Sequence, residues 1–208
     1  FLDCVSMATS QFDRLPNELQ LMVMGYPDDP KTLYSMARVN STWSAYAINQ
    51  LWACPPQRAL EVLATLCPKS RRQFFASKVR SLFLQKPKPA FKTLVFDSLT
   101  TLCFAPRGGL NDLNYDSFIQ PSLRSLSYYG DETLTADSIN LVRLRCTDLR
   151  SLKVYDEISS DSRTFVGLLQ SLHHLESLSL GYRMDHSAVQ DVLACLAGHA
   201  SKKLERLT

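Results

Sequence analysis

The stretch Leu123-Arg-Ser-Leu-Ser-Tyr128 recurs with small changes along the second half of this 208-residue chain. The clear copies are Leu149-Arg-Ser-Leu-Lys-Val154, Leu175-Glu-Ser-Leu-Ser-Leu180 and the incomplete Leu204-Glu-Arg-Leu-Thr208, and the weaker ones are Val79-Arg-Ser-Leu-Phe-Leu84 and Leu99-Thr-Thr-Leu-Cys-Phe104. The clear copies begin 26, 26 and 29 residues apart. Each copy alternates apolar and polar residues as a short strand does. A unit of this size cannot bury its own apolar face, so successive units are expected to stack.

Helical spacing of apolar residues fills the gaps between the later copies. Such runs lie between positions 136 and 146, 165 and 172, and 189 and 196. Each unit is therefore predicted to be a strand, a loop and a helix, with the strands side by side in one concave sheet. The section from Lys86 to Gln120 contains several Pro and Gly residues, and no helix is predicted there.

The N-terminal part predicts three short helices. Leu15, Leu19, Met22 and Val23 lie on one helical face, and Pro16 suits the first position of that helix. Asp29 before Pro30 is a start signal for the second helix, and Asn40 or Ser41 can cap the third. Further helical runs are expected over 56–80.

Three elements of this N-terminal part fall in a familiar order: Leu15-Pro16-Asn17-Glu18-Leu19, Val39-Asn40-Ser41-Thr42-Trp43 and Leu51-Trp52, with Leu33 in between. The stretch resembles the F-box motif. It departs from the family at Pro27, where a leucine is usual, and in a loop at Asp28-Asp29 that is one residue longer than the commonest form.

The resemblance implies an adaptor rather than an enzyme. F-box domains dock on the small S-phase kinase-associated type adaptor subunit of cullin–RING ubiquitin ligases, and through it on a cullin. The residues expected to make this contact are Leu15, Pro16, Glu18, Leu19, Leu33, Val39, Trp43, Leu51 and Trp52. Their number exceeds what so small a helical bundle needs inside. The alternative is that they form an internal core with the helices that follow.

The repeats resemble leucine-rich repeats, of the irregular kind attached to many fungal F-box proteins, because the Asn or Cys usual after the strand is absent. The expected fold class is α plus α/β, a three-helix F-box followed by an irregular leucine-rich-repeat solenoid. The expected organisation is a disordered leader at 1–10, the F-box at 11–55, a helical linker at 56–90 and repeats at 78–208. Since the last copy stops in mid-strand, the natural protein is expected to continue.

Strand alternation predicts which repeat residues face away from the core. The fourth and sixth positions of each copy point inward, so the third and fifth face the concave surface. Together with flanking second positions, they give the expected target-binding residues Ser125, Ser127, Arg150, Ser151, Lys153, Glu176, Ser177 and Ser179. The alternative is a solvated sheet face without a partner.

The net charge of +3 conceals an uneven distribution. Residues 1–90 hold 11 basic and 6 acidic residues, and 91–208 hold 12 and 14. The basic excess comes from Lys69, Arg71, Arg72, Lys78, Arg80, Lys86 and Lys88. This stretch predicts a solvated face or a surface for an acidic partner. Nucleic acid is not the expected ligand, because the stretch does not place interleaved aromatic residues on a clear scaffold.

Several function classes find no support in the sequence. No apolar run reaches the ~20 residues of a membrane helix. The 6 cysteines are widely spaced without a CxxC pair, which favours a reduced, intracellular protein in the cytoplasm or nucleus. No catalytic motif or metal-ligand spacing is present, so neither a cofactor nor a metal is expected. A repeat-based interaction scaffold that works outside a ligase remains the alternative function.

Overall fold

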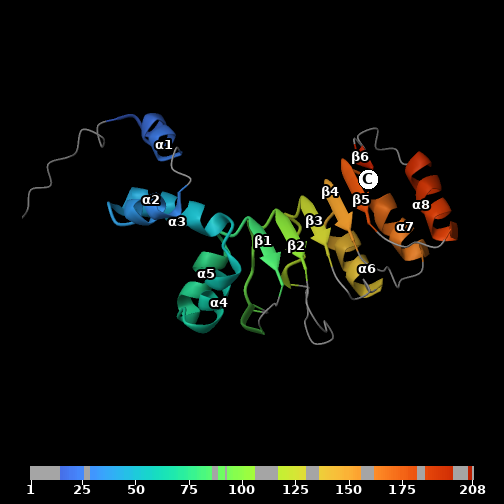
Figure 1. Cartoon of the computed structure of the whole chain (residues 1–208), viewed down its shortest axis with the longest axis horizontal. Coiled ribbons are helices and arrows are strands. Elements are labelled where there is room, and N and C mark those ends of the chain that lie inside the picture. Colours follow the sequence, from blue (N-terminus) through green and yellow to red (C-terminus); the bar gives the residue numbers. More distant parts are fainter. Residues whose placement is uncertain are drawn as a thin grey trace, which may run out of the picture. The chain divides into compact units, whose positions relative to one another are not determined.

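The computed structural model describes residues 15–25, 29–85, 89–91, 93–105, 117–129, 136–155, 162–181, 186–198 and 206–207 (Figure 1). The expected leader at 1–10 lies outside the described residues. The chain divides into two compact units, Phe1–Leu51 and Trp52–Thr208.

The described part of the first unit contains α1 (Asn17–Gly25), α2 (Pro30–Met36) and all but the C-terminal end of α3 (Ser41–Ala53), as the sequence predicts. The carboxylate of Asp29 accepts the backbone N–H of Thr32 at 3.0 Å, which caps α2. The side-chain oxygen of Asn40 accepts the backbone N–H of Trp43 at 2.9 Å, which caps α3 in the same way. Both predicted helix starts are confirmed.

The core of the first unit is small. Its buried residues are Leu33, Met36 and Ala47, and the partly buried Ala37, Trp43, Tyr46 and Leu51 pack around them. A core of this size stabilises a three-helix unit only modestly.

The second unit begins with α4 (Gln57–Thr65) and α5 (Lys69–Ala76), which confirms the helices predicted over 56–80. Leu60, Leu63 and Ala76, from these two helices, belong to the same buried cluster as the strands that follow. The segment expected to be a linker therefore covers one end of the core of the second unit.

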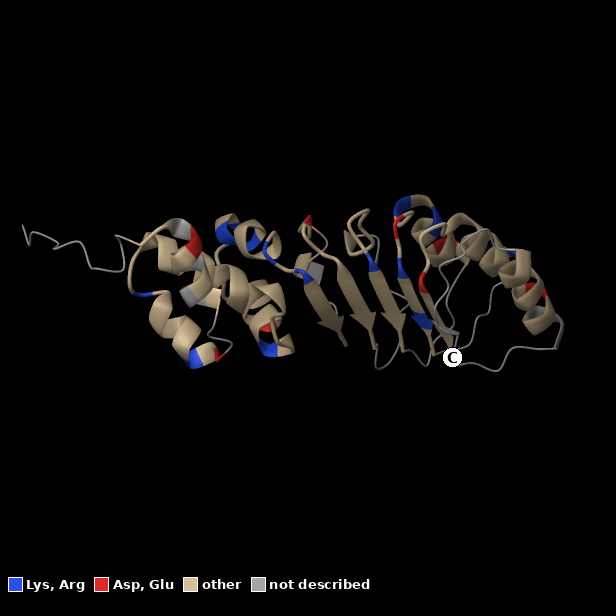
Figure 2. Ribbon diagram, turned by 90° about the horizontal axis from the view of Figure 1, so that it is seen from above, with Lys and Arg blue, Asp and Glu red and all other residues tan. Residues whose placement is uncertain are grey.

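A parallel sheet of 6 strands is the centre of the second unit, with the strands in sequence order (Figure 2). The strands are β1 (Ser81–Leu84), β2 (Thr101–Phe104), β3 (Ser125–Tyr128), β4 (Ser151–Val154), β5 (Ser177–Leu180) and β6 (Arg206–Leu207). Their register pairs the third positions of successive copies, Ser81, Thr101, Ser125, Ser151, Ser177 and Arg206. The predicted alignment of the repeats, weak copies included, is confirmed.

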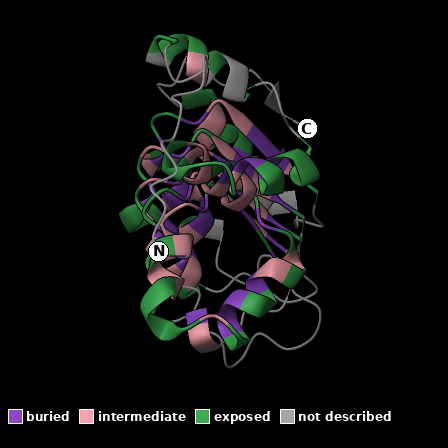
Figure 3. Ribbon diagram, turned by 90° about the vertical axis from the view of Figure 1, so that its left-hand side faces the viewer, coloured by how far each residue is buried: buried purple, intermediate pink, exposed green. Residues whose placement is uncertain are grey.

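Helices α6 (Ala136–Arg145), α7 (Ser162–Ser171) and α8 (His186–Gly198) follow β3, β4 and β5 at the predicted positions. Their buried side chains, among them Ile139, Leu168 and Val192, form one core with the fourth positions of the strands (purple in Figure 3). The helices therefore cover one face of the sheet, and the third and fifth strand positions lie on the other.

An aromatic cluster fills the core where no helix was predicted. Among the described residues between β1 and β3, no α-helix flanks β2, and the short 3-10 helix η2 (Pro89–Phe91) lies before it. The Phe118 ring lies 5.3 Å from the Phe96 centroid, and 6.3 Å and 6.4 Å from those of Phe91 and Phe104. All four side chains are buried. Bulky rings thus fill the space that α6–α8 fill in the later repeats.

A turn of the same kind precedes each of the first five strands. In the turn before β2, the backbone N–H of Leu99 donates to the carbonyl of Phe96 at 2.9 Å. The equivalent bonds run from Val79 to Ala76, Leu123 to Gln120, Leu149 to Cys146 and Leu175 to Leu172. The structural repeat therefore begins three residues before the six-residue sequence pattern.

Candidate functional site

Helix α1 carries an exposed apolar stripe. The stripe consists of Leu15, which lies just before the helix, Leu19 and Met22. These residues have the i, i+4, i+7 spacing of one helical face, and Met22 is 63% exposed. Elsewhere in the first unit, Tyr34 is 65% and Val39 is 61% exposed. Several large apolar side chains of this small unit are thus open to solvent, and contiguous apolar patches on protein surfaces often mark interaction sites.

The structure separates the expected adaptor-binding residues into exposed and packed ones. The exposed residues are Leu15, Pro16, Glu18, Leu19 and Val39. Leu33 is buried, and Trp43 and Leu51 pack against it and its neighbours. The ring of Trp52 lies 4.6 Å from that of Phe75, within the core of the second unit. These four residues make packing contacts, and their part in adaptor binding stays a prediction.

Two exposed apolar residues were absent from the expected adaptor-binding set. Met22 continues the stripe of Leu15 and Leu19, and its position at i+7 was the available signal. Tyr34 lies on α2, beside the buried Leu33. Leu33, Met36 and Ala37 follow the i, i+3, i+4 spacing of the inner face, and Tyr34 falls outside it, which was the available signal.

The open face of the second unit, defined as the third and fifth positions of β1–β5 and the residue after each strand, is rich in serine. The register aligns Ser125, Ser151 and Ser177 in one row. It aligns Ser127, Lys153 and Ser179 in the next. Lys153 is the one charged residue among the third and fifth positions of β1–β5. Most of these side chains are half-buried rather than fully solvated.

Two tyrosines and a glycine extend the open face past the strand ends. Tyr129, Tyr155 and Gly181 directly follow β3, β4 and β5. The two tyrosine rings stack with centroids 4.7 Å apart and planes 8° apart. The Tyr155 hydroxyl lies 2.9 Å from that of Ser179, which is only 4% exposed. Continuing the strand alternation by two residues would have placed both tyrosines on this face.

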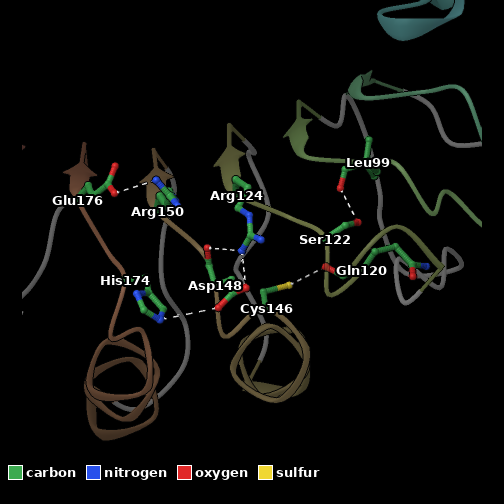
Figure 4. A network of polar contacts seen from close by, with 9 residues as sticks. All are labelled: Leu99, Gln120, Ser122, Arg124, Cys146, Asp148, Arg150, His174 and Glu176. Atoms are coloured by element: carbon green, nitrogen blue, oxygen red, sulfur yellow. Dashed lines mark hydrogen bonds and ion pairs between the residues drawn. The ribbon is translucent and has the colours of Figure 1, made fainter. Parts of the chain in front are cut away.

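Ion pairs join successive repeats at the other ends of the strands (Figure 4). Arg124 Nη1 lies 2.6 Å from a carboxylate oxygen of Asp148, and also donates to the Asp148 carbonyl at 3.1 Å. The hydrogen bond and charge of Arg124 lower the pKa of Asp148. Arg150 pairs with Glu176 at 3.2 Å. These two residues, expected to bind a target, thus also hold neighbouring repeats together.

Part of the basic stretch 69–88 makes local contacts. Arg72 Nε donates to the carbonyl of Cys67 at 2.9 Å. Lys78 lies over the ring of Phe74, 5.4 Å from its centroid. Lys69, Arg71 and Arg80 are exposed, and Lys86 and Lys88 lie outside the described residues. Of the five basic residues of this stretch that the structure describes, three are therefore exposed and two are half-buried.

Thiols and metal-binding groups offer no further site in the described part of the chain. Cys54, Cys67, Cys103, Cys146 and Cys195 are free thiols. Burial raises the pKa of the Cys146 thiol to about 12. No cluster of His, Cys, Asp or Glu suited to a metal ion occurs among the described residues. None of the described helices has the length and apolar character needed to cross a bilayer.

Comparison with known protein families agrees with the resemblance of the first unit. Residues 12–57 match the family model described as F-box-like. A search of the curated proteins finds no match to the chain. F-box domains typically bind S-phase kinase-associated type adaptors and thereby a cullin, and F-box proteins are generally non-catalytic. The chain therefore carries an F-box-like domain at residues 12–57, followed by a parallel sheet backed by helices.

Proposed function

We propose that this protein is the substrate-recognition subunit of an SCF-type ubiquitin ligase, working in the cytoplasm or nucleus. The observation that carries the proposal is the exposed apolar stripe of α1, Leu15, Leu19 and Met22, within the F-box-like match at 12–57. Full burial of an exposed Leu or Met side chain contributes about 1.5–3 kcal/mol. Leu15, Leu19 and Met22 are partly exposed, so each contributes a fraction of this, and together they support docking of an adaptor subunit.

The proposed docking surface consists of the α1 stripe with Pro16, Glu18, Tyr34 and Val39. Glu18 and Pro16 lie beside Leu15 and Leu19 in the sequence and are exposed. Leu33, Trp43 and Leu51 support the surface from inside, because they form the core on which the helices pack. The contact would also cover apolar area that this small unit leaves in water.

We further propose that the second unit is an irregular leucine-rich-repeat solenoid of the fungal type, and that its open face captures the target protein. The regular register from β1 to β6 supports a repeat architecture. Solenoids commonly bind partners on the sheet face that their helices leave open. Here that face offers the serine rows, Lys153 and the stacked tyrosines.

Such a subunit needs no catalytic group of its own. By holding a target near the ligase, it raises the effective concentration of the target's lysines at the site of ubiquitin transfer. Rate enhancement would come from proximity. The measurable products are a ternary complex and a modified target.

The experiment is affinity purification of the chain from cells, with and without proteasome inhibition. The proposal expects an adaptor subunit and a cullin in both samples, and target proteins enriched by inhibition. Leu19→Asp with Met22→Asp should remove adaptor and cullin together, whereas Leu144→Asp, at an exposed apolar site on α6, should not. An adaptor recovered without any cullin would contradict the ligase role and favour a scaffold outside a ligase.

A further inference from the structure

Tyr129 and Tyr155 form an ordered aromatic pair on the open face that the F-box role does not explain. They are 42% and 39% exposed although their rings stack on each other. The Tyr155 hydroxyl is hydrogen-bonded to Ser179, and its ring lies over Gly181, where a Cβ atom would overlap it. Both rings are therefore fixed before any partner arrives. Fixed tyrosines provide contact area with little further loss of side-chain entropy.

The described part of the row that contains this pair ends in a small side chain on one side. Backbone bonds from Tyr129 N–H to the carbonyl of Phe104, and from Gly181 N–H to that of Val154, align Ala105, Tyr129, Tyr155 and Gly181 across β2–β5. Tyr155 covers one face of the Tyr129 ring. On the opposite side, the next side chain of the row is only the methyl group of Ala105. A planar side chain from a partner can stack there and continue the row.

The charge of the same face is positive. Lys153 lies between Ser127 and Ser179 in the register, two residues before Tyr155. The positive charge of Lys153 also acts on Cys103 of β2. Burial raises the pKa of the Cys103 thiol, and the charge of Lys153 opposes that rise. The third and fifth positions of β1–β5 contain no carboxylate. Among these strand positions, an acidic group on a partner would thus meet the cation of Lys153 and no carboxylate.

We propose that the open face binds an extended segment of a protein in which an aromatic residue has an acidic residue close beside it. The aromatic ring stacks on Tyr129 above Ala105, and the carboxylate pairs with Lys153. The hydroxyls of Ser125, Ser127 and Ser151 are available to the backbone of the segment. This inference rests on the proposed function, because the segment would belong to the target.

A protein segment fits this face better than other ligands of similar chemistry. Single-stranded nucleic acid also stacks on tyrosine, but it needs a groove of several cations along its phosphates, and this face has one lysine. A membrane surface would require exposed apolar side chains where serine predominates. Nucleic acid is therefore kept as a competing outcome of the test.

The test is selection of random displayed peptides of about twelve residues on the whole chain. Enriched peptides are expected to share an aromatic residue beside Asp or Glu. The affinity of one such peptide should fall about tenfold or more with Tyr129→Ala and with Lys153→Glu, and should survive Tyr129→Phe, which keeps the ring. Selection on Lys153→Glu should replace Asp and Glu by Lys and Arg beside the aromatic residue.

Matched controls separate this face from the rest of the surface. Leu144→Ala removes an exposed apolar side chain on α6, and Arg71→Glu reverses an exposed charge on α5. Both should leave peptide affinity unchanged. Unaltered melting temperatures of the Tyr129 and Lys153 variants show that a loss of affinity is not a loss of fold.

Three outcomes overturn the inference: no enriched peptide, enriched peptides without the aromatic–acidic pair, and binding that persists in both Tyr129→Ala and Lys153→Glu. Binding of an oligo-dT strand that depends on Tyr129 would replace it by a nucleic-acid site. Adaptor binding by Tyr129→Ala is measured in parallel. If that complex forms while no peptide is selected, the inference fails and the F-box function stands. If neither forms, both fail.

Discussion

The ring of Tyr155 lies over the backbone of Gly181 so closely that a methyl group at Gly181 would overlap the Cδ1 and Cε1 atoms of the ring. Stacking on Tyr129 and the hydrogen bond to Ser179 hold the ring in this place. Because Gly181 has no side chain, the Tyr155 ring can lie directly on the backbone that follows β5. A larger residue at position 181 would displace the ring.

Gly181→Ala should destabilise the second unit by about 1–3 kcal/mol, because the ring must move and lose its contacts. Urea unfolding measures the change. Gly198→Ala is the matched control, since nothing lies within 4 Å of a Cβ at that position. Removing the ring with Tyr155→Ala should abolish most of the effect of Gly181→Ala. Equal effects of Gly181→Ala in both backgrounds would contradict the proposed contact.

The ion pair of Arg124 and Asp148 should make stability depend on pH in one direction. The hydrogen bond and charge of Arg124 lower the pKa of Asp148 below its ordinary value of 3.8 in the folded protein. The stabilisation that the ion pair provides is therefore fully present above pH 3.8, and it is lost as the pH falls through the lowered pKa of Asp148 in the folded protein. Asp148→Asn should lower the melting temperature at about pH 7, and the difference from wild type should shrink toward about pH 3.

Two further measurements identify the cause of that pH dependence. Added salt should reduce the effect of Asp148→Asn, because both side chains are partly exposed. In an Arg124→Ala background, the same substitution should change the melting temperature little. A difference from wild type that grows on acidification would show that the pairing is not the source.

The two tryptophans report on the two units separately. Trp43 packs in the small core of the first unit, and Trp52 stacks near Phe75 in the second. With Trp52→Phe, fluorescence follows the first unit alone. In that background, Leu33→Ala should cost about 2–5 kcal/mol, because it empties part of the core. Leu19→Ala, at an exposed site, should cost about 0.5 kcal/mol or less. Similar losses of stability for Leu33→Ala and Leu19→Ala would contradict the placement of Leu33 in the core and Leu19 on the surface.

Thiol reactivity should follow burial. Cys54 is exposed, whereas Cys146 is buried, donates to the carbonyl of Gln120 at 3.5 Å and has a pKa raised to about 12. Only about one Cys146 in ten thousand would be a thiolate at about pH 8. Iodoacetamide and peptide mass analysis should find Cys54 modified and Cys146 intact in the folded chain. Full modification in urea is the control, and rapid labelling of native Cys146 would contradict its placement.

Repetition explains why the sheet was predictable from the sequence. Each copy has the apolar pattern of the same short strand. Aligning the copies by their first residues therefore gives the same register as the pairing of the strands in the sheet. These first residues are Val79, Leu99, Leu123, Leu149, Leu175 and Leu204. Helix caps were equally local: Asp29 and Asn40 act within three residues of themselves. Features that depend on residues close together in the sequence were therefore predictable.

Features that depend on distant side chains were not predicted. The cluster around Phe118 joins residues from Phe91 onward, and no periodicity relates them. Ser179 was expected on the open face, and its burial results from Tyr155, a residue 24 positions earlier. By contrast, in the F-box-like domain, Leu33, Met36 and Ala37 share the i, i+3, i+4 spacing of one helical face, which separates the inward-facing Leu33 from the exposed Tyr34.

The central claim is that the exposed stripe of α1 docks an S-phase kinase-associated type adaptor subunit. The most direct test is calorimetric titration of the purified chain with that subunit. We predict a one-to-one complex with a Kd of about 1 μM or tighter, weakened about a hundredfold by Leu19→Asp with Met22→Asp while the fold persists. Absence of a complex, or equal affinity of the double variant, would contradict the claim.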